Sequence, residues 1–406
     1  MRKSTLACLG LALVSALALT AVATGGVRAQ DGPIRVGELN SYKRIPAFLE
    51  PYKKGWELAV EEINAAGGVN GRKIEVISRD DSGTPGEAVR AADELVTREK
   101  VSLLTGGFLS NVGLAVANYA KQRKVVYIAA EPLTDKLVWE DGNAYTFRLR
   151  ASTYMQVDML VDEAVKLKKK RWALIYPNYE YGQSAVASFK QLMRAKQPDV
   201  EFVAEQAPPL GKIEAGAVAQ AIADAKPDAI FNVTFGGDLQ KLVREGTTRG
   251  LFKDVAVFSL LGGEPEYLDP LKAEAPVGWY VTGYPWDQIK TPEHEAFLKA
   301  YQAKWNDYPR LGSVVGYSAI KAVAAALAKA GSTDMDKIRA AMADLPVETP
   351  FGKVVFRALD HQSTMGAFVG RTAVKDGRGV MVDWRYEPGD QHLPPDDVVK
   401  AKRPQE

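Results

Sequence analysis

The stretch AVEEINAAGGVNGRKIEVISRDDSGTP, residues 59–85, determines the order of three elements in the chain. The apolar residues before its glycines, beginning just upstream of the stretch, recur at the spacing of one face of a helix. They are Trp56, Ala59, Val60, Ile63 and Ala66. Gly67 follows at the position where a helix commonly ends in the left-handed conformation. The stretch therefore predicts a helix that stops at the glycines.

A glycine-rich loop beside a helix can also be a phosphate cradle, and the order of elements decides between the two. A phosphate loop needs its glycines after a strand and at the start of a helix, so that helix N–H groups face the anion. Here the glycines are followed by the turn dipeptide Asn70-Gly71 and by a strand at 73–78. The next helix is expected to start with Thr84 as N-cap, Pro85 at its first position and Glu87 completing a capping box. The sequence thus predicts a structural turn and no phosphate site.

The N-terminus has the pattern of an export signal. Two basic residues precede a long apolar stretch, and Val27 and Ala29 suit a signal peptidase site after Ala29. A retained membrane anchor is the alternative, because the apolar stretch approaches spanning length. The abundance of Ala and Thr and the small residues at its end favour a cleaved signal peptide, residues 1–29.

Cleavage determines what chemistry remains in the mature chain. Cys8, the single cysteine, lies inside the signal segment, so the mature chain has no thiol for disulfides, metal binding or nucleophilic catalysis. Loss of three basic residues leaves 49 of the 52 Lys and Arg against 50 Asp and Glu. Such a nearly neutral chain lacks the basic patch of a nucleic-acid binder. At 406 residues, two domains are expected.

Strands and amphipathic helices alternate along the chain, which predicts an α/β fold with parallel sheets covered by helices. Further strands are expected at 124–130, 171–177, 228–234, 254–263 and 278–285. About eight such units exceed one compact sheet, so two α/β lobes are predicted. Ligands in such sheets bind at the carboxyl ends of the strands, which here are rich in hydroxyls, amides and aromatic rings. A small polar ligand is expected there.

The sequence carries no pattern that supports catalysis. His294, His361 and His392 are scattered, none follows a predicted strand, and each is expected at the surface. No G-x-S-x-G nucleophile elbow and no metal-spaced Cys/His set occurs. We therefore expect no enzymatic activity, no metal and no cofactor.

Four segments together resemble a known family. They are IRVGELN (34–40), the block 55–95, YEYGQS (179–184) and GSVVGYSAIKAVAAALAKAGSTD (312–334). They resemble the leucine/isoleucine/valine-binding type of periplasmic substrate-binding protein, the receptor of ATP-driven (ABC) importers. The resemblance extends over almost all of 33–388.

The resemblance implies two Rossmann-like lobes joined by three hinge crossings, the type I or Venus flytrap arrangement. Lobe 1 would comprise 33–148 and 283–352, and lobe 2 would comprise 149–282 and 353–388. The tail 389–406 would be loosely packed. The resemblance also implies a monomeric receptor in the periplasm, which binds a small molecule between the lobes and delivers it to a membrane permease.

The resemblance further implies which residues contact the ligand. A serine-bearing loop would bind the ligand carboxylate, the next loop would hold carboxylate and amine, and two aromatic residues of lobe 2 would cover the ligand. The matching positions are Ser110 with Asn111, then Glu131 and Thr134, then Tyr181 and Phe235.

The chain departs from the family at the acidic residue that pairs with the ligand ammonium. A gapless match places Gly262 there, with Glu264 two residues further on. Either Glu264 or Glu131 substitutes, or the ligand has no α-amine. Tyr42, in a first-lobe loop where many members have small residues, would suit an aromatic or other apolar carboxylate, or would only pack at the hinge.

Three functions follow from these residues. The first is a receptor for a branched-chain or neutral amino acid or a related small carboxylate. The second is the same role for an aromatic or other non-amino carboxylate or an amide. A ligand-sensing receptor domain is a third, but no second membrane segment or DNA-binding element is evident. An exported hydrolase lacks a nucleophile motif.

Overall fold

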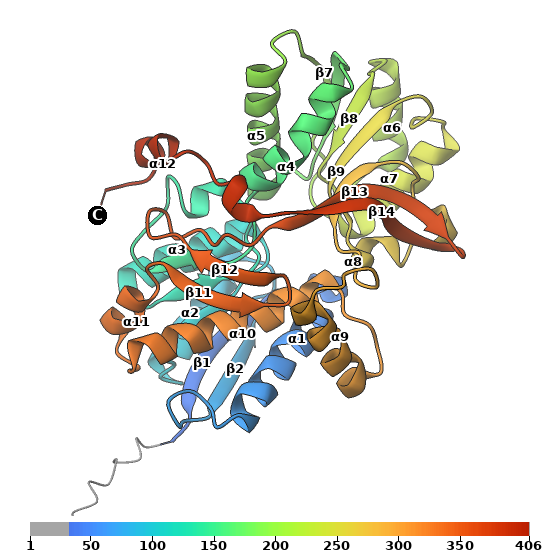
Figure 1. The fold of residues 1–406 in the computed structure, drawn as a ribbon. Coiled ribbons are helices and arrows are strands. Elements are labelled where there is room, and N and C mark those ends of the chain that lie inside the picture. Colours follow the sequence, from blue (N-terminus) through green and yellow to red (C-terminus); the bar gives the residue numbers. More distant parts are fainter. Residues whose placement is uncertain (1–31, 406) are drawn as a thin grey trace, which may run out of the picture. The chain divides into compact units, whose positions relative to one another are not determined.

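The structure, a computed structural model, describes residues 32–405. The predicted signal peptide at 1–29, including Cys8, lies outside the described residues. Two separate mainly parallel sheets with helices on both faces confirm the predicted α/β fold class (Figure 1).

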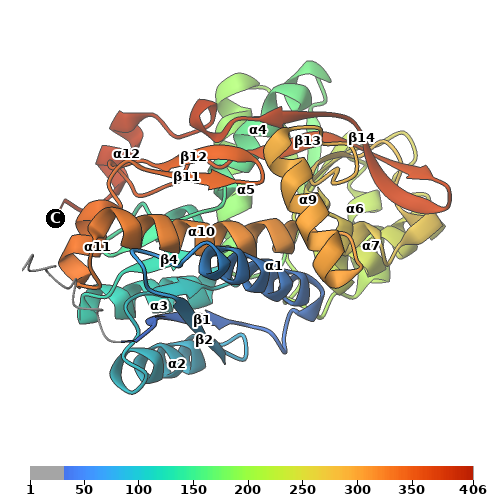
Figure 2. The same cartoon turned by 60° about the horizontal axis from the view of Figure 1, so that its bottom comes forward.

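The first sheet consists of five parallel strands in the order β2-β1-β3-β4-β5. They are β1 (Ile34–Asn40), β2 (Ile74–Asp80), β3 (Leu104–Gly106), β4 (Tyr127–Ala129) and β5 (Thr146–Arg148). Helices α1 (Pro46–Ala65) and α10 (Leu311–Ala330) pack together on one face, and α2 (Pro85–Thr97) and α3 (Ser110–Arg123) lie on the other (Figure 2). Strands β1, β3, β4 and β5 are buried between these helices, as expected of a parallel sheet, whereas the edge strand β2 is mostly half-buried.

The second sheet has seven strands in the order β14-β13-β10-β9-β8-β6-β7. The parallel strands are β6 (Arg171–Ile175), β7 (Glu201–Gln206), β8 (Ala229–Asn232), β9 (Ala256–Gly263) and β10 (Tyr280–Gly283). An antiparallel hairpin of β13 (Ala367–Lys375) and β14 (Arg378–Glu387) extends the sheet at β10. Helices α4 (Thr153–Lys166) and α5 (Glu180–Lys196) pack together, as do α6 (Ala215–Asp224) and α7 (Gly236–Thr248).

Shorter elements complete the described chain. They are α8 (Pro265–Leu268), α9 (Pro292–Trp305), α11 (Met335–Ala341), α12 (Asp396–Lys402), β11 (Leu345–Thr349), β12 (Gly352–Phe356) and the 3-10 turns Asp135–Leu137, Lys272–Glu274 and Gly389–Gln391. Because β11 pairs with β12, positions 345–356 form one hairpin, and the predicted lobe boundary at 352 falls inside it. The lobe boundaries themselves stay a prediction.

Helices α1 and α10 approach so closely that glycine is required between them. A Cβ at Gly316 would lie 2.1 Å from the carbonyl oxygen of Tyr52, and one at Gly55 would lie 2.0 Å from that of Ser313. Among residues 32–405, α10 alone is long and apolar enough to span a membrane by length and composition, but 72% of its apolar window is buried in the protein. This burial identifies α10 as a core helix that packs against α1 and the first sheet.

The glycine-rich stretch forms the predicted helix, stop, turn and strand. Helix α1 ends at Ala65, and Gly67 and Gly68 adopt φ values of 101° and 79° before β2 begins. Glycine is obligatory at the second position, since a Cβ at Gly68 would lie 2.0 Å from the carbonyl oxygen of Arg72. The turn thus has a structural role in connecting α1 to β2.

The capping box predicted at the start of α2 is wrong. Thr84 is the N-cap residue, but its side chain makes no capping hydrogen bond. The Glu87 carboxylate instead forms an exposed ion pair with Arg90, one turn further along the same helix. A charged partner at this spacing competes with the backbone amide for the carboxylate.

The expectation that all three histidines lie at the surface is also wrong. His294 is fully buried, its Nε2 is 2.6 Å from the Tyr284 hydroxyl oxygen, and burial lowers its pKa to about 4. His361 stacks on the ring of Phe147 at 4.1 Å, and burial likewise lowers its pKa to about 4. Aromatic neighbours thus accommodate these two rings in the neutral form.

The tail after 388 is packed against the protein, contrary to the expectation of a loose segment. His392 contacts Asp158 of α4 at 2.9 Å, and Val399 of α12 is fully buried. Arg403 donates to the carbonyl oxygens of Val138 at 2.8 Å and Asn143 at 3.0 Å. Buried apolar contact and satisfied carbonyl groups together attach this segment.

Candidate functional site

The carboxyl ends of strands from both sheets meet at one small buried cavity. Ser110 and Glu131 follow β3 and β4 of the first sheet, whereas Tyr181 and Phe235 follow β6 and β8 of the second. The remaining lining residues are Phe108, Leu133, Tyr179 and Leu261. The cavity volume is ≈ 10 Å³, about the space that one water molecule requires. This is the location expected for ligands of open α/β sheets.

Aromatic rings from both sheets form the apolar wall of the cavity. Phe235 lies 6.0 Å from Phe108 and 5.8 Å from Tyr181, and the second pair meets edge to face. Phe108 also packs at 5.0 Å on Phe48 of α1. Such ring pairs contribute about 0.5–1.5 kcal/mol beyond the area that they bury. Ligand atoms that face these rings are expected to be apolar.

A buried arginine lies between two buried glutamates beside the aromatic wall. Arg150, just after β5, donates through Nη1 to Glu131 and through Nη2 to Glu264, which follows β9. The side chains are 7%, 3% and 0% exposed, in the order arginine, Glu131, Glu264. Because Glu131 follows a strand of the first sheet and Glu264 one of the second, this triad joins the two sheets.

Burial governs the protonation of the triad. It raises the pKa of Glu131 to about 7 and that of Glu264 to about 7, although Arg150 opposes the shift in both. Burial acts in the opposite direction on Arg150, but the two carboxylates outweigh it and hold the guanidinium pKa above its usual value. A third carboxyl nearby, Glu266, has its pKa raised to about 8 by burial and then by Glu264. Acidic groups therefore outnumber the single guanidinium.

Several polar atoms of this region have no hydrogen-bond partner. Among the described residues these atoms include Oε2 of Glu131, Oε2 of Glu264 and the hydroxyl of Tyr181. A buried polar group without a partner costs about 1–3 kcal/mol, and more when it is charged. Buried polar groups are normally hydrogen-bonded, so this cluster of exceptions beside the cavity identifies it as a candidate binding site.

The structure distinguishes between the two candidates for the acidic position after β9. A Cβ at Gly262 would lie 2.7 Å from the Ser259 hydroxyl oxygen, so this position faces the interior of the second sheet. Glu264 instead reaches Arg150. Leu261, just before Gly262 near the end of β9, has a φ of 64°, which is unusual for a residue with a bulky side chain.

Four of the predicted residues do not line the cavity: Glu264, which binds Arg150 beside it, and Thr134, Tyr42 and Asn111. The Thr134 hydroxyl donates to Oε1 of Glu180 at 2.8 Å, which ties the loop after β4 to α5. The Tyr42 hydroxyl accepts a 3.0 Å hydrogen bond from Nε1 of Trp56 in α1. Asn111 lies in the first turn of α3, and its Oδ1 has no partner.

Other residues of the site were not predicted from the sequence. Arg150 was missed, although the stretch TFRLRAS places two arginines in an otherwise apolar segment at the end of β5. Phe108, Leu133 and Tyr179 lie in segments that follow strands, where ligands of such sheets bind, but no motif singles them out. Leu261 carries no sequence signal, because an apolar residue in a strand gives no hint of a left-handed backbone.

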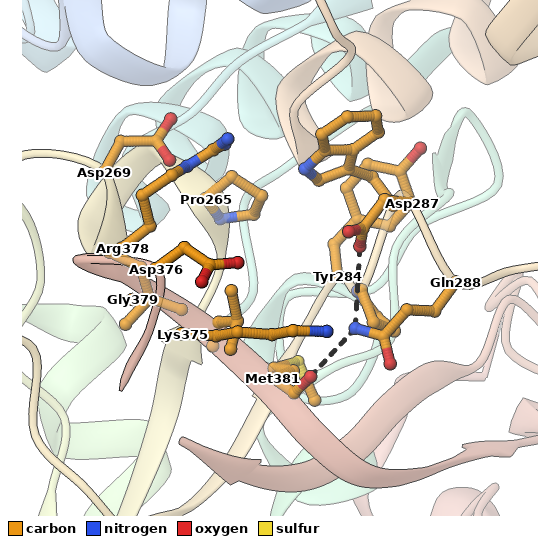
Figure 3. A pocket seen from close by; sticks show the side chains of 15 residues that line it. Pro265, Asp269, Tyr284, Asp287, Gln288, Lys375, Asp376, Arg378, Gly379 and Met381 are labelled. Atoms are coloured by element: carbon orange, nitrogen blue, oxygen red, sulfur yellow. Dashed lines mark hydrogen bonds between the residues drawn. The ribbon is translucent and has the colours of Figure 1, made fainter. Parts of the chain in front are cut away.

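A larger hollow of ≈ 190 Å³ lies just beyond the carboxyl end of β9, between α8 and the β13–β14 turn (Figure 3). In Figure 3 the Arg378 guanidinium points toward Asp269, whereas the Lys375 side chain extends across the hollow toward Gln288. Gln288 donates to the carbonyl oxygen of Met381 at 2.9 Å. The charged residues of the turn are exposed, so they remain hydrated and offer less binding energy than the buried triad.

Two α/β sheets whose strand ends converge on a buried, polar and aromatic cavity define a two-lobed protein that binds small molecules. The sequence model described as periplasmic binding protein matches residues 44–378. The chain therefore belongs to the periplasmic binding protein family, and the resemblance found in the sequence is confirmed.

Individual relatives and solved structures agree with this assignment. Leu/Ile/Val-binding protein homolog 7 of Brucella abortus (strain 2308) is 26% identical over 351 residues, which cover 82% of this chain and 86% of that protein. A second similar protein is the branched-chain amino acid transporter substrate-binding protein of Streptococcus pneumoniae in complex with isoleucine. Its structure has a TM-score of 0.76 at 25% identity, and the match covers 87% of this chain and 100% of that chain. A solute-binding protein of an ABC transporter from Rhodopseudomonas palustris BisB5, in complex with 3,4-dihydroxybenzoic acid, has a TM-score of 0.77 at 24% identity, covering 88% and 98%.

Proposed function

We propose that this protein is the extracytoplasmic solute receptor of an ABC importer and binds a small carboxylate at the cavity described above. The observation that carries the proposal is the convergence of four predicted residues on one cavity. Ser110 and Glu131 come from the first sheet and Tyr181 and Phe235 from the second. Convergence from two sheets is what a ligand enclosed between two lobes requires.

The ligand class follows from the lining of the site. Phe108, Tyr181 and Phe235 offer an apolar wall, and Ser110 offers a hydroxyl donor for a carboxylate. Behind the lining, Arg150 binds Glu131 and adds guanidinium donors to the site. A branched-chain or neutral amino acid fits this lining, and so does an aromatic carboxylate. Relatives of this fold in complex with isoleucine and with 3,4-dihydroxybenzoic acid support both options.

The mechanism would be closure of two lobes around the ligand. Lobe 1 would comprise 33–148 and 283–352, and lobe 2 would comprise 149–282 and 353–388. The cavity volume of ≈ 10 Å³ is too small for an amino acid, so a ligand enters only after the lobes separate. Binding then shifts an equilibrium between open and closed forms in proportion to the difference in affinity.

The cellular role follows from the family. The receptor would act in the periplasm as a monomer after removal of residues 1–29, without enzymatic activity, and would deliver the ligand to a membrane permease. Ser110, Asn111, Glu131, Thr134, Tyr181, Phe235 and Glu264 are the proposed ligand residues. Tyr42 belongs to the second option, an aromatic ligand.

A thermal-shift screen tests the receptor function. The mature protein, from residue 30, is heated with leucine, valine, phenylalanine, benzoate and 4-hydroxybenzoate, each at about 10 mM. A ligand that binds the folded form alone raises Tm by an amount that grows with its concentration. We expect at least one of these compounds to do so. A Tm that none of them changes contradicts the proposed ligand class.

A further inference from the structure

The loop after β4 faces two ways. Glu131 lines the cavity, whereas residues 134–136 turn toward helix α5 of the second sheet. The start of α5 is arranged in the same manner, because Tyr179 and Tyr181 line the cavity and Glu180 between them turns to the loop. The contact between loop and helix therefore borders the cavity and uses residues other than those that line it.

The centre of this contact is the carboxylate of Asp135, which is 5% exposed. Its Oδ2 accepts hydrogen bonds from three hydroxyl groups, those of Thr153 at 2.7 Å, Ser188 at 2.9 Å and Ser184 at 3.1 Å. Its Oδ1 accepts from the backbone amide of Tyr154 at 3.0 Å. Ser184 and Ser188 lie four residues apart in α5 and so share one face of the helix. A buried carboxylate is costly unless it is hydrogen-bonded, and these donors offset that cost.

The neighbours of Asp135 add weaker contacts to the same helix. The Thr134 hydroxyl donates to Oε1 of Glu180 at 2.8 Å, and the Lys136 ammonium lies 3.3 Å from Oε2 of the same residue. The Lys136 side chain is half exposed, so its ion pair contributes little. Hydrogen bonds to a buried carboxylate are stronger, which makes Asp135 the main contributor.

The first sheet holds the loop from the other side. Arg148, at the end of β5, is 1% exposed, and its Nη1 donates to the carbonyl oxygens of Leu133, at 3.2 Å, and Thr134. The turn Asp135–Leu137 also packs against α3. Because the loop is fixed to the first sheet and the serines belong to a helix of the second, their hydrogen bonds break when the two sheets move apart.

We propose that Asp135 and the hydroxyl groups of Thr153, Ser184 and Ser188 form a latch that keeps the two lobes in the arrangement of this structure when no ligand is bound. The inference rests on the proposed two-lobed closure and goes beyond ligand binding, since it assigns part of the free energy of closure to the protein alone. A ligand that binds this arrangement then gains apparent affinity in proportion to the fraction of molecules already in it.

Distances between spin labels in the ligand-free protein test the latch. The mature chain has no cysteine, because Cys8 lies in the predicted signal segment, so Gln122→Cys in α3 and Gln220→Cys in α6 introduce the label sites. Both positions are exposed. We expect pulsed electron paramagnetic resonance of this labelled protein to give one distance that agrees with the structure.

Two variants of the labelled protein remove the latch from opposite sides. Ser184→Ala with Ser188→Ala removes two donors from α5 and should raise the ratio of open to closed molecules by about 100-fold, seen as a second, longer distance. Asp135→Asn keeps the size of the side chain, removes its charge and should raise the ratio by about 10-fold. Alanine favours helix formation, so the double serine variant is expected to fold.

Thr248→Ala is the matched control, because the exposed Thr248 hydroxyl of α7 donates only within its own helix, to the carbonyl oxygen of Arg244 at 2.9 Å. It should keep the distance of the parent protein. An unchanged distance in the double serine variant overturns the latch, even if its Tm falls, because a merely structural role would lower Tm alone. A ligand-free parent protein that is already open overturns it as well.

The result does not depend on the ligand screen, since every distance is measured without a ligand. A latch that fails this test leaves the receptor function intact. A screen in which no compound raises Tm contradicts the proposed ligand class and leaves the latch intact.

Discussion

The contact between α1 and α10 leads to a prediction whose size follows from the structure. A Cβ added at Gly316 would lie 2.1 Å from the carbonyl oxygen of Tyr52, whereas ordinary contact begins at 3.4 Å, so Gly316→Ala requires the helices to separate by 1.3 Å. The opposing atoms belong to the backbone and no side chain can rotate away. Overpacking of this kind costs about 3 kcal/mol, at the upper end of its usual range. The higher helix propensity of alanine returns about 1 kcal/mol.

The net loss expected for Gly316→Ala is thus about 2 kcal/mol, which lowers Tm by about 4–8 °C. Urea unfolding followed by circular dichroism and a thermal scan measure it. Gly86→Ala is the matched control, because no atom lies within 4 Å of a Cβ at that position of α2. It should be neutral or stabilising by up to about 1 kcal/mol. If Gly316→Ala unfolds at the same urea concentration as the wild type, the close approach of the helices is incorrect.

Three further predictions follow from other parts of the molecule. Burial raises the pKa of Glu38 to about 8, so the folded form binds this proton more tightly than the unfolded chain does. The free energy of unfolding should therefore fall as pH rises from about 4.5 to 8, and Glu38→Gln should flatten that fall in urea titrations. An unchanged dependence of the free energy of unfolding on pH would contradict this prediction. Ser110→Ala and Tyr181→Ala should each weaken ligand binding measured by calorimetry, since both residues line the cavity. Unchanged affinity in both variants would show that this cavity is not the ligand site. Arg403→Ala removes the hydrogen-bond donors of two carbonyl groups in the 138–143 loop, so it should lower the free energy of unfolding by about 1–2 kcal/mol and speed proteolysis of the tail. Equal proteolysis rates for the variant and the wild type would refute the attachment.

Much of the architecture could be predicted because each local signal agreed with the fold. The helix period before Gly67, the turn at Asn70-Gly71 and the alternation in 73–78 each depend on a few neighbouring residues. Parallel sheets then follow from the repeated order of strand and helix. Local patterns could not reveal the packed tail, since its attachment depends on Arg403 reaching carbonyl groups of a loop more than 250 positions away.

The site could be predicted only to the level of strand-end loops. The rule that ligands bind at strand ends selects a segment but not the side chain that turns inward. In the loop after β4 it is Glu131 that faces the cavity, while Thr134 turns to Glu180. Arg150 was missed because its role depends on two glutamates contributed by different sheets, and no sequence spacing encodes that meeting.

Contacts between segments of the two sheets also limit how far a ligand can shift the equilibrium between open and closed forms. Bonds between segments of the two sheets are already present without a ligand, such as Thr134 to Glu180 at 2.8 Å and the Tyr308 hydroxyl to Asp269 at 2.8 Å. A ligand that interacts equally with the open and closed forms shifts nothing between them, however tightly it binds. Only contacts that the ligand makes in the closed form, and that no protein group makes in its absence, favour closure. The Oε2 atoms of Glu131 and Glu264, which follow strands of different sheets, offer such contacts, because both are buried and no protein group binds them. A ligand that donates hydrogen bonds to these oxygens therefore gains free energy that the protein's own groups do not supply, and that gain favours the form in which the two glutamates meet.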